Sequence, residues 1–362
     1  MQFFDNHSLL NIYLLRAVLK KDLCLTFLFF FSLSCFSQDI PETFLRTADS
    51  LIKSRPSTYR EIDKVLRPNR KDTLLMREFV KRAEKEKYWA GQAYGLNQLG
   101  RTYRSISEFS KALILFRKAL SVSEEADDIE FRVYSLNMIS VVFRRTDAIK
   151  SALDYSQEAL KLAESVEKPS NGLKRSINVS LNSIGNIYQI LEQYDLAIDK
   201  FSQSMVLEKE LGNKLGLAIN YQNIGECYEA QGKLDVALSS FQTSLAFNKE
   251  INSQKGKTIC KNSIAHVYVK QGKIEEALEI LKAILVEAIQ LGDQKIITSI
   301  YVNLGWTLIQ KGNYTDAELN LNKSLAIAKK YNLPTEIAES NKFLSELYIK
   351  KNNFKKGMEF YK

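Results

Sequence analysis

The sequence predicts an all-α protein assembled from a repeated helical unit. Its 362 residues exceed the roughly 250–300 residues that a single hydrophobic core organises. Only 5 prolines and 15 glycines occur, which leaves long stretches without a helix breaker. Similar segments also return about every forty residues through most of the chain. These three observations favour an elongated array of helices over one compact core.

Each repeated unit has the pattern of two amphipathic helices. In the first copy, Leu96, Leu99 and Tyr103 fall on one helical face, and Ala112 and Phe116 share a face in the segment that follows. The small residue of the second helix marks seven copies, at Ala112, Ala152, Ala197, Ala237, Ala277, Ala317 and Gly357. Successive copies are 40 residues apart, except for one spacing of 45 that contains the turn-forming insertion KPSNG at 168–172.

Glycine recurs in the middle of the first helix, at Gly100, Gly185, Gly225 and Gly305. Such a glycine costs about 1 kcal/mol relative to alanine. Its recurrence therefore predicts that the two helices of a unit approach each other closely there. Further glycines, in the short QGK and KGN segments between the helices, are placed to end a helix.

The motif L-G-x-x-Y followed by A-x-x-x-F-x-x-A resembles the tetratricopeptide repeat in a forty-residue form. The resemblance covers residues 74–362 and implies an all-α, right-handed superhelical solenoid of stacked helix-turn-helix repeats. We expect about seven units, the last one truncated within its second helix, behind a degenerate N-terminal helical cap at 38–73. Two units depart from the motif, with Ser140 and Ser345 in place of glycine and Ser156 in place of phenylalanine.

The N-terminal segment has the parts of a secretory signal peptide. Arg16, Lys20 and Lys21 precede fourteen uncharged, mostly apolar residues at 23–36, and the small Ser37 closes the run. We therefore expect residues 1–37 to be a signal peptide and the protein to be exported to the periplasm or cell envelope. The alternative is an uncleaved signal anchor as the one membrane contact, although the run is short for a span of about 20 residues.

The composition argues against catalytic and metal sites. The chain has 2 histidines, His7 and His266, and its 4 cysteines form no C-x-x-C pair. No nucleotide-binding glycine loop or nucleophile-elbow motif occurs. We predict no enzyme activity, cofactor or metal, and we predict that Cys227 and Cys260 are buried small apolar residues. The net charge of +9 comes from interspersed charges rather than blocks, which disfavours nucleic acid as a partner.

The residue after the first leucine position of five units is an amide: Asn97, Asn137, Asn182, Gln222 and Asn262. In the family that the sequence resembles, this position and those four and seven residues further on line a concave groove. The correspondence adds Arg101, Asn186, Glu226 and His266 at the second position, and Arg104, Arg144, Gln189 and Glu229 at the third. Two interpretations of the amides are open: a ladder that bonds the backbone of a ligand, or one that bonds neighbouring helices to each other.

These arguments predict a non-enzymatic scaffold that binds a peptide or protein in the concave groove. Basic residues gather in the first two units and acidic ones in the fourth, which would fix the direction of a ligand unless both are simply solvated. The residues are Arg101, Arg104, Arg144, Arg145, Glu226 and Glu229. A second hypothesis is the periplasmic sensory portion of a histidine kinase or helix-turn-helix regulator. Arrays that resemble this one often continue into such output domains.

Overall fold

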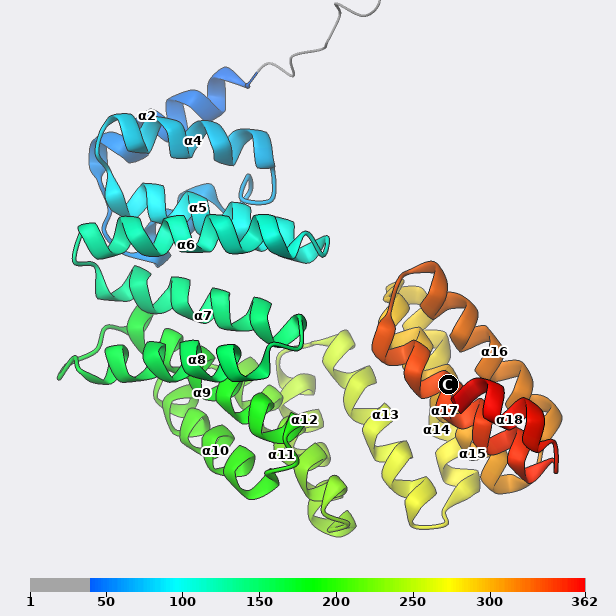
Figure 1. Cartoon of the computed structure of the whole chain (residues 1–362). Coiled ribbons are helices and arrows are strands. Elements are labelled where there is room, and N and C mark those ends of the chain that lie inside the picture. The colour runs from blue at the N-terminus through cyan, green and yellow to red at the C-terminus, as the bar shows by residue number, and fades with distance from the viewer. Residues whose placement is uncertain (1–39, 362) are drawn as a thin grey trace, which may run out of the picture. The chain divides into compact units, whose positions relative to one another are not determined.

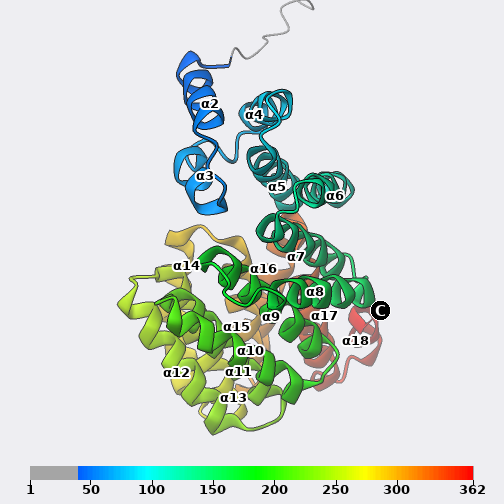
Figure 2. The same ribbon diagram turned by 90° about the vertical axis from the view of Figure 1, so that its left-hand side faces the viewer.

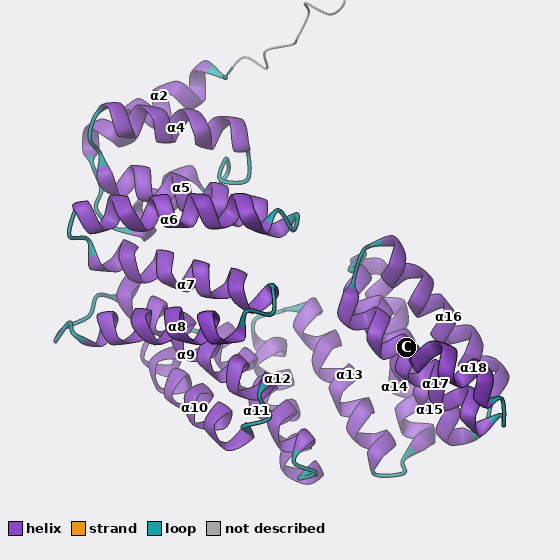
Figure 3. Ribbon diagram, viewed as in Figure 1, coloured by secondary structure: helices purple, strands orange, loops and turns teal. Residues whose placement is uncertain are grey.

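The computed structural model describes residues 40–361, and every regular element in that part of the chain is an α-helix (Figure 3). The described part of the chain divides into two units, with the division between Ser54 and Arg55. The described part of the first unit is α2 (Glu42–Ser54), an amphipathic helix. The predicted signal peptide at 1–37 lies outside the described residues. No helix within 40–361 combines the length and the apolar character needed to cross a membrane.

The second unit is a stack of helical hairpins (Figure 1). It begins with α3 (Tyr59–Leu66) and α4 (Thr73–Lys85). The first helices of the seven repeats are α5 (Trp89–Ser105), α7 (Ile129–Arg145), α9 (Asn171–Ile190), α11 (Lys214–Ala230), α13 (Gln254–Lys270), α15 (Gln294–Lys311) and α17 (Pro334–Lys350). Their second helices are α6 (Phe109–Glu125), α8 (Ile149–Glu164), α10 (Tyr194–Glu210), α12 (Leu234–Glu250), α14 (Ile274–Leu291), α16 (Tyr314–Lys330) and α18 (Phe354–Tyr361). The predicted all-α, right-handed superhelical solenoid of stacked repeats is confirmed.

The repeats form an inner and an outer layer of helices. A second helix such as α6 packs between the first helix of its own repeat and that of the next one. Consecutive first helices also pack against one another, as α5 does on α7 and α7 on α9. Because neighbouring repeats meet along their first helices, these helices line the concave side of the stack. We call the surface that they form there the inner face.

Helix α3 does not extend the stack but lies beside α5, on the side opposite to α6 (Figure 2). The Tyr59 ring stacks on Tyr134 of α7, with ring centroids 4.8 Å apart. Asp63 is buried and accepts a hydrogen bond of 2.9 Å from the Tyr94 hydroxyl of α5. The segment 38–73, predicted as a degenerate cap, therefore includes a helix that covers part of the inner face of the first two repeats.

The mid-helix glycines allow close packing within a repeat. A Cβ atom added at Gly100 would lie 2.5 Å from the Phe116 ring, and one at Gly225 would lie 2.6 Å from the Phe241 ring. The same arrangement recurs at Gly185 with Phe201 and at Gly305 with Leu321. The predicted close approach is confirmed, and the group that fills the space is the large apolar side chain of the second helix.

The turns between the two helices of a repeat contain a residue with left-handed backbone. Gly232, Gly272 and Gly312 have φ of 75°, 79° and 82°, as expected for glycines that end a helix. Ser107 and Glu192 adopt the same conformation in the first and third repeats, with φ of 62° and 59°. The turn geometry is therefore a property of the repeat and is kept even where no glycine is present.

Candidate functional site

Two residues of the predicted amide row are buried between helices. Asn97 is 0% exposed, and its Nδ2 donates to Ser135 Oγ of α7 at 3.0 Å. Asn137 is 1% exposed, donates to the Ser176 carbonyl at 2.9 Å and accepts from Ser180 Oγ at 2.9 Å, both on α9. Their placement in the groove is therefore wrong, because the next first helix covers them. Of the two interpretations of the amides, the one in which they bond neighbouring helices to each other holds for Asn97 and Asn137.

The next two amides of the row are bonded to neighbouring helices but keep an unpaired oxygen. Asn182 Nδ2 donates to Ser204 Oγ of α10 at 2.8 Å. Gln222 Nε2 donates to Ser263 Oγ of α13 at 2.8 Å. The carbonyl oxygens of Asn182 and Gln222 are buried and have no hydrogen-bond partner. These two side chains therefore join helices and still have an acceptor to offer.

Asn262 continues the row on α13. Its Nδ2 donates to Ser299 Oγ at 3.1 Å, and its Oδ1 accepts from Asn303 Nδ2 at 3.0 Å, both on α15. The amide position thus lies where one first helix meets the next. Partner binding by Asn182, Gln222 and Asn262 stays a prediction.

The basic residues of the predicted groove lie in the second halves of α5 and α7. Arg101 Nη1 donates to the hydroxyls of Tyr59 at 3.0 Å and Tyr134 at 3.2 Å. Arg104 reaches a methionine sulphur at 3.5 Å, and Arg144 Nε is buried without a partner. Burial lowers the pKa of Arg104 and Arg144, and neighbouring guanidinium groups lower it further. Within residues 40–361, none of the three arginines pairs with a carboxylate.

Glu229, on α11, is paired within the protein. It accepts hydrogen bonds from His266 Nδ1 and, at 2.9 Å, from Lys270 Nζ, both on α13. Burial raises the pKa of Glu229, but these donors outweigh burial and leave the pKa below its ordinary value. The His266 ring lies 4.6 Å, between centroids, from Trp306 of α15. Both predicted groove residues, Glu229 and His266, are thus held by each other and by their neighbours.

Glu226, one turn before Glu229, is satisfied by amides. It accepts hydrogen bonds from Gln222 Nε2 at 3.1 Å and from Gln189 Nε2 at 3.3 Å, and burial raises its pKa. Asn186, at the equivalent position of α9, donates to a backbone carbonyl of its own helix at 2.7 Å. The acidic residues of the inner face are therefore bonded internally, whereas Arg104 and Arg144 of the basic end pair with no carboxylate of the described residues.

Three connected hollows run along the inner face. The first, of about 400 Å³, lies between α3, α7 and α9, and the second, of about 380 Å³, lies between α9 and α11. The third, of about 400 Å³, lies between α11 and α13. Arg175 and Val179 line both the first and the second hollow, and Leu215 and Ile219 line both the second and the third. We call this continuous depression the inner trough.

The inner trough combines exposed apolar side chains with amides. Val179, Leu215 and Ile219 are 38%, 50% and 49% exposed. The amides of the second hollow are Asn178, Asn182, Asn186, Asn213 and Asn223. The groove predicted from the sequence did not include the apolar position three residues before the amide row, which Val179, Ile219 and Ile259 share. A signal was present, because branched apolar residues recur there in consecutive repeats.

A donor and an acceptor at the wall of the second hollow have no partner. Asn178 is 3% exposed, and its Nδ2 makes no hydrogen bond. The unpaired Oδ1 of Asn182 follows one helical turn later. Buried polar atoms are nearly always paired, because leaving one unpaired costs about 1–3 kcal/mol. The trough therefore offers the two kinds of group that a polypeptide backbone needs.

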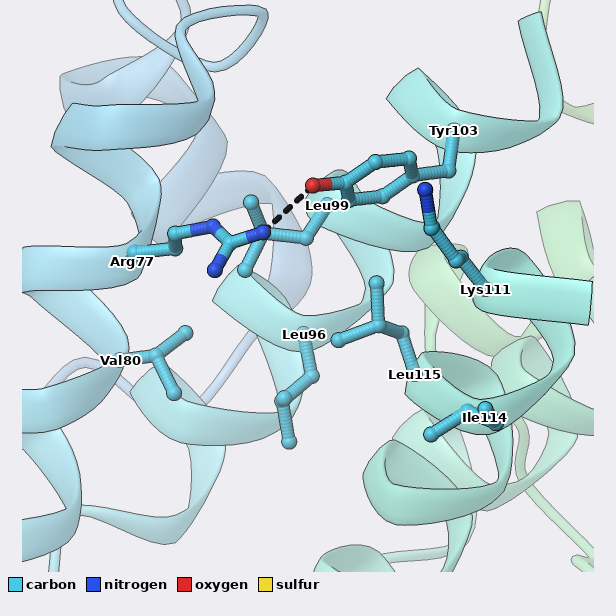
Figure 4. Close-up of a pocket in the computed structure, with 8 residues that line it drawn as sticks. All are labelled: Arg77, Val80, Leu96, Leu99, Tyr103, Lys111, Ile114 and Leu115. Carbon is cyan, nitrogen blue, oxygen red and sulfur yellow. Dashed lines mark hydrogen bonds between the residues drawn. The ribbon is translucent and has the colours of Figure 1, made fainter. Parts of the chain in front are cut away.

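A fourth hollow, of about 300 Å³, lies between α4, α5 and α6 (Figure 4). Leu96, Leu99 and other apolar side chains form its floor. Arg77 donates to the Tyr103 hydroxyl at 2.5 Å, and the Lys111 ammonium lies 5.8 Å from the centre of the same ring. No unpaired buried polar atom of the described residues faces this hollow. We interpret it as a packing gap between helices.

The described residues contain no group of three or more His, Cys, Asp or Glu side chains that could hold a metal ion. Cys227 and Cys260 are free and buried, as predicted. Burial raises the pKa of the Cys227 thiol to about 12, so this thiol stays protonated at neutral pH.

Half of the chain matches models of one protein family. The segments 93–126, 176–250 and 258–330 match the tetratricopeptide repeat. The chain belongs to the tetratricopeptide repeat family. The matched segments correspond to the first, third, fourth, fifth and sixth repeats of the array. The two tetratricopeptide repeats with serine in place of the motif glycine lie outside them.

A comparison with curated proteins finds no significant sequence match to this tetratricopeptide repeat protein. Solved structures share its fold at low identity. The apo form of the quorum sensor NprR from B. thuringiensis is 16% identical, with a TM-score of 0.65 over 96% of this chain and 94% of that one. Aspartyl phosphate phosphatase F from Bacillus subtilis is 17% identical, with a TM-score of 0.64 over 79% and 73%. The Rap conjugation gene regulator of plasmid pLS20, in complex with the Phr* peptide, is 18% identical, with a TM-score of 0.60 over 77% and 73%.

Proposed function

We propose that this tetratricopeptide repeat protein is a non-enzymatic scaffold that binds an extended peptide, or an extended segment of a protein, along the inner trough. The observation that carries the proposal is the unpaired pair at the second hollow, Asn178 Nδ2 and Asn182 Oδ1. An extended backbone presents carbonyl and amide groups that need such partners. A peptide that filled the hollow would satisfy both atoms, which the protein alone leaves unpaired.

The apolar side chains of the trough supply the second part of the argument. Val179, Leu215 and Ile219 stay exposed, although burying such a side chain stabilises a complex by about 1.5–3 kcal/mol. Ligand sites commonly combine apolar walls with a few placed polar groups. Because the three hollows follow one another along α7, α9, α11 and α13, the trough suits an elongated ligand better than a compact one.

The solved neighbours support the same type of ligand. One is a regulator solved with a peptide, and another is a quorum sensor. A third is named as a phosphatase. On the inner face of this chain, His266 is bonded to Glu229, but within residues 40–361 no hydroxyl or thiol that could act as a nucleophile is hydrogen-bonded to His266. The proposed scaffold is therefore non-enzymatic.

Export is the further part of the proposal. The apolar segment 23–36, with basic residues before it, supports a signal peptide and a location in the periplasm or cell envelope. A sensory portion of an envelope signalling protein is the alternative role for an exported array of this kind. Cell fractionation with an antibody against the array tests the location, and recovery in the cytosol alone would contradict it.

The ligand can be sought with a bead library of random heptapeptides and purified protein. Ile219→Lys places a charge where the second and third hollows meet. We expect it to weaken the capture of heptapeptides at least about tenfold, because it removes apolar contact area. Val206→Lys is the matched control, since Val206 is 59% exposed on α10 of the outer layer.

Three results would count against the proposal. The first is that the wild type retains no heptapeptide. The second is that wild type and Ile219→Lys capture heptapeptides equally well. The third is that Ile219→Lys and Val206→Lys lose the same amount of heptapeptide capture. Circular dichroism of both variants shows whether the fold is kept.

A further inference from the structure

Four arginines at the ends of two neighbouring first helices lie together without a counter-charge. They are Arg101, Arg104, Arg144 and Arg145, from the second halves of α5 and α7, and we call them the arginine cluster. Their guanidinium groups are close enough to affect one another, because Arg101, Arg144 and Arg145 all act on Arg104. In the part of the chain that the structure describes, no carboxylate forms an ion pair with any of the four.

The arginine cluster is costly for the protein to keep. Arg104 and Arg144 are half-buried, and burial together with like charge disfavours their charged forms. Arg144 Nε is buried and has no hydrogen-bond partner. Arg101 alone is well held, by two tyrosine hydroxyls. Three guanidinium groups thus keep donors that nothing in the described chain uses.

The ends of the helices do not account for this charge. The C-terminus of a helix carries about half a negative charge, which favours one nearby cation. Both α9 and α11 have no basic residue in their last turn, and α13 has only Lys270. In α7, Arg144 and Arg145 share the last turn, and Arg104 of α5 lies beside them. The positive charge of the cluster therefore exceeds what two helix ends balance.

Acidic residues of the same face do not neutralise the cluster either. Glu229 is paired with His266 and Lys270. Glu226 is bonded by Gln189 and Gln222. The balancing anion must then come from outside the described chain.

We propose that the arginine cluster binds an oxyanion group of the ligand, the carboxylate of an acidic residue or a phosphoryl group. The planar guanidinium group matches both with paired, charge-assisted hydrogen bonds. The inference rests on the proposed function, because it makes the ligand of the inner trough an acidic peptide.

The distance along α7 sets where the acidic residue falls. Tyr134 lines the first hollow, and Arg144 lies ten residues later on the same helix. At about 1.5 Å per residue of helix, the two positions are about 15 Å apart. An extended peptide covers this distance in roughly four or five residues at about 3.3 Å each. We therefore expect the acidic residue of the ligand to lie four or five residues, at about 3.3 Å each, from the ligand residue that contacts Tyr134.

The first experiment measures the oxyanion site directly. Isothermal titration calorimetry with 1,2,3-tricarballylate, and separately with inorganic phosphate, is done on the purified protein at constant ionic strength. We expect binding that weakens at least about tenfold in Arg144→Gln, because charge-assisted bonds to the guanidinium group are lost. Arg117→Gln is the matched control: Arg117 is exposed on α6, outside the cluster. Arg144→Gln should melt no lower than wild type in chloride, since it removes a half-buried charge.

The second experiment uses heptapeptide libraries that carry Asp, phosphoserine or Asn at one position. The wild type should capture the Asp or the phosphoserine library at least about tenfold better than the Asn library, and Arg144→Gln should lose this preference. The better of the two acidic libraries identifies the source of the oxyanion.

Several results would overturn the inference. If the wild type captured all three libraries equally well, the inference would be overturned and the proposed function would stand. The proposed function is tested separately, by Ile219→Lys. A preference for acidic peptides that survives Arg144→Gln would also overturn the inference. So would a single-stranded oligonucleotide that binds more tightly than the acidic peptides and depends on Arg144.

Discussion

Ser140 Oγ and Ser156 Oγ are 2.5 Å apart and hydrogen-bonded in the second repeat. They occupy the positions where other repeats place a glycine of the first helix against a phenylalanine ring of the second. Ser140 Oγ also donates to the Ala152 carbonyl at 2.8 Å. The two departures from the family motif are therefore coupled, because a serine at 140 leaves no room for a phenylalanine at 156.

Restoring the motif in this repeat tests the coupling. Ser156→Phe alone should destabilise the protein by about 1–3 kcal/mol, because the ring would overlap the Ser140 side chain. Adding Ser140→Gly should recover most of that loss. Chemical unfolding of wild type, both single variants and the double variant gives the interaction energy, which for contacting residues is about 0.5–3 kcal/mol. Additive effects of the two changes would contradict the packing relationship.

The amides of the inner face divide into those buried between helices and those that line the inner trough, and two alanine variants can separate the two kinds. Asn137→Ala should lower the melting temperature, because it removes two buried hydrogen bonds to α9 of about 0.5–1.5 kcal/mol each. Asn223→Ala, in the second hollow, should leave the melting temperature unchanged and weaken heptapeptide capture. Thermal melts and bead capture are measured on the same samples. The reverse pattern would show that Asn137 is available to ligands and Asn223 is structural.

The buried carboxyl of Glu226 should destabilise the fold increasingly as the pH rises. Burial holds the pKa of its carboxyl above the ordinary value of 4.5. A raised pKa in the folded state means that its stabilising contribution is present below pH 4.5 and is lost as the pH rises through the raised pKa. Glu226→Gln should therefore melt like wild type at pH 4 and higher than wild type at pH 8. A constant difference in melting temperature across this range would contradict the assignment.

Glu229 serves as the control of opposite sign. Its pKa lies below 4.5, because the bonds from His266 and Lys270 outweigh burial. The stabilisation from Glu229 is therefore present above pH 4.5 and is lost as the pH falls through the lowered pKa. Glu229→Gln should melt lower than wild type at pH 7, and the gap should close at acid pH.

The centre of the array is sensitive to added volume. Ala237 is 0% exposed and packs with Phe241, Ile264 and Val267. Ala237→Leu should cost about 1–3 kcal/mol through overpacking. Because each repeat contacts only its neighbours, we expect the array to melt as two separate halves. Calorimetry that shows one unshifted transition would refute this account.

The repeat architecture could be predicted from the sequence because it depends on contacts within and between adjacent units. The spacing between Gly100 and Phe116 recurs along the chain, and it predicts that the first helix of a repeat packs against the second. The position of Asn97 could not be predicted in the same way. A single helix places it beside the apolar stripe, but only the stacked array shows that α7 covers it.

The inner trough could not be predicted from the sequence for a related reason. Tyr59 lies 75 residues before Tyr134, and the repeat pattern does not indicate that α3 packs on α5 and α7. The unpaired Nδ2 of Asn178 could not be predicted either, because it depends on Ser204 of α10. The Ser204 hydroxyl donates to Asn178 Oδ1 and accepts from the Nδ2 atoms of Asn182 and Asn220. The clustering of the arginines was predicted from the sequence, but their lack of a carboxylate partner among the described residues is evident only in the structure.

The contact between consecutive first helices has a mechanical consequence. Neighbouring repeats meet along their first helices, and each second helix also packs on the next first helix, so the angle at one junction sets the direction of every repeat that follows. A ligand that lies across α7, α9, α11 and α13 spans three such junctions. We therefore expect its affinity to include the free energy of holding three inter-repeat angles at once. Substitutions that change the packing of a second helix on the next repeat should alter those angles, and with them the affinity, without touching the ligand.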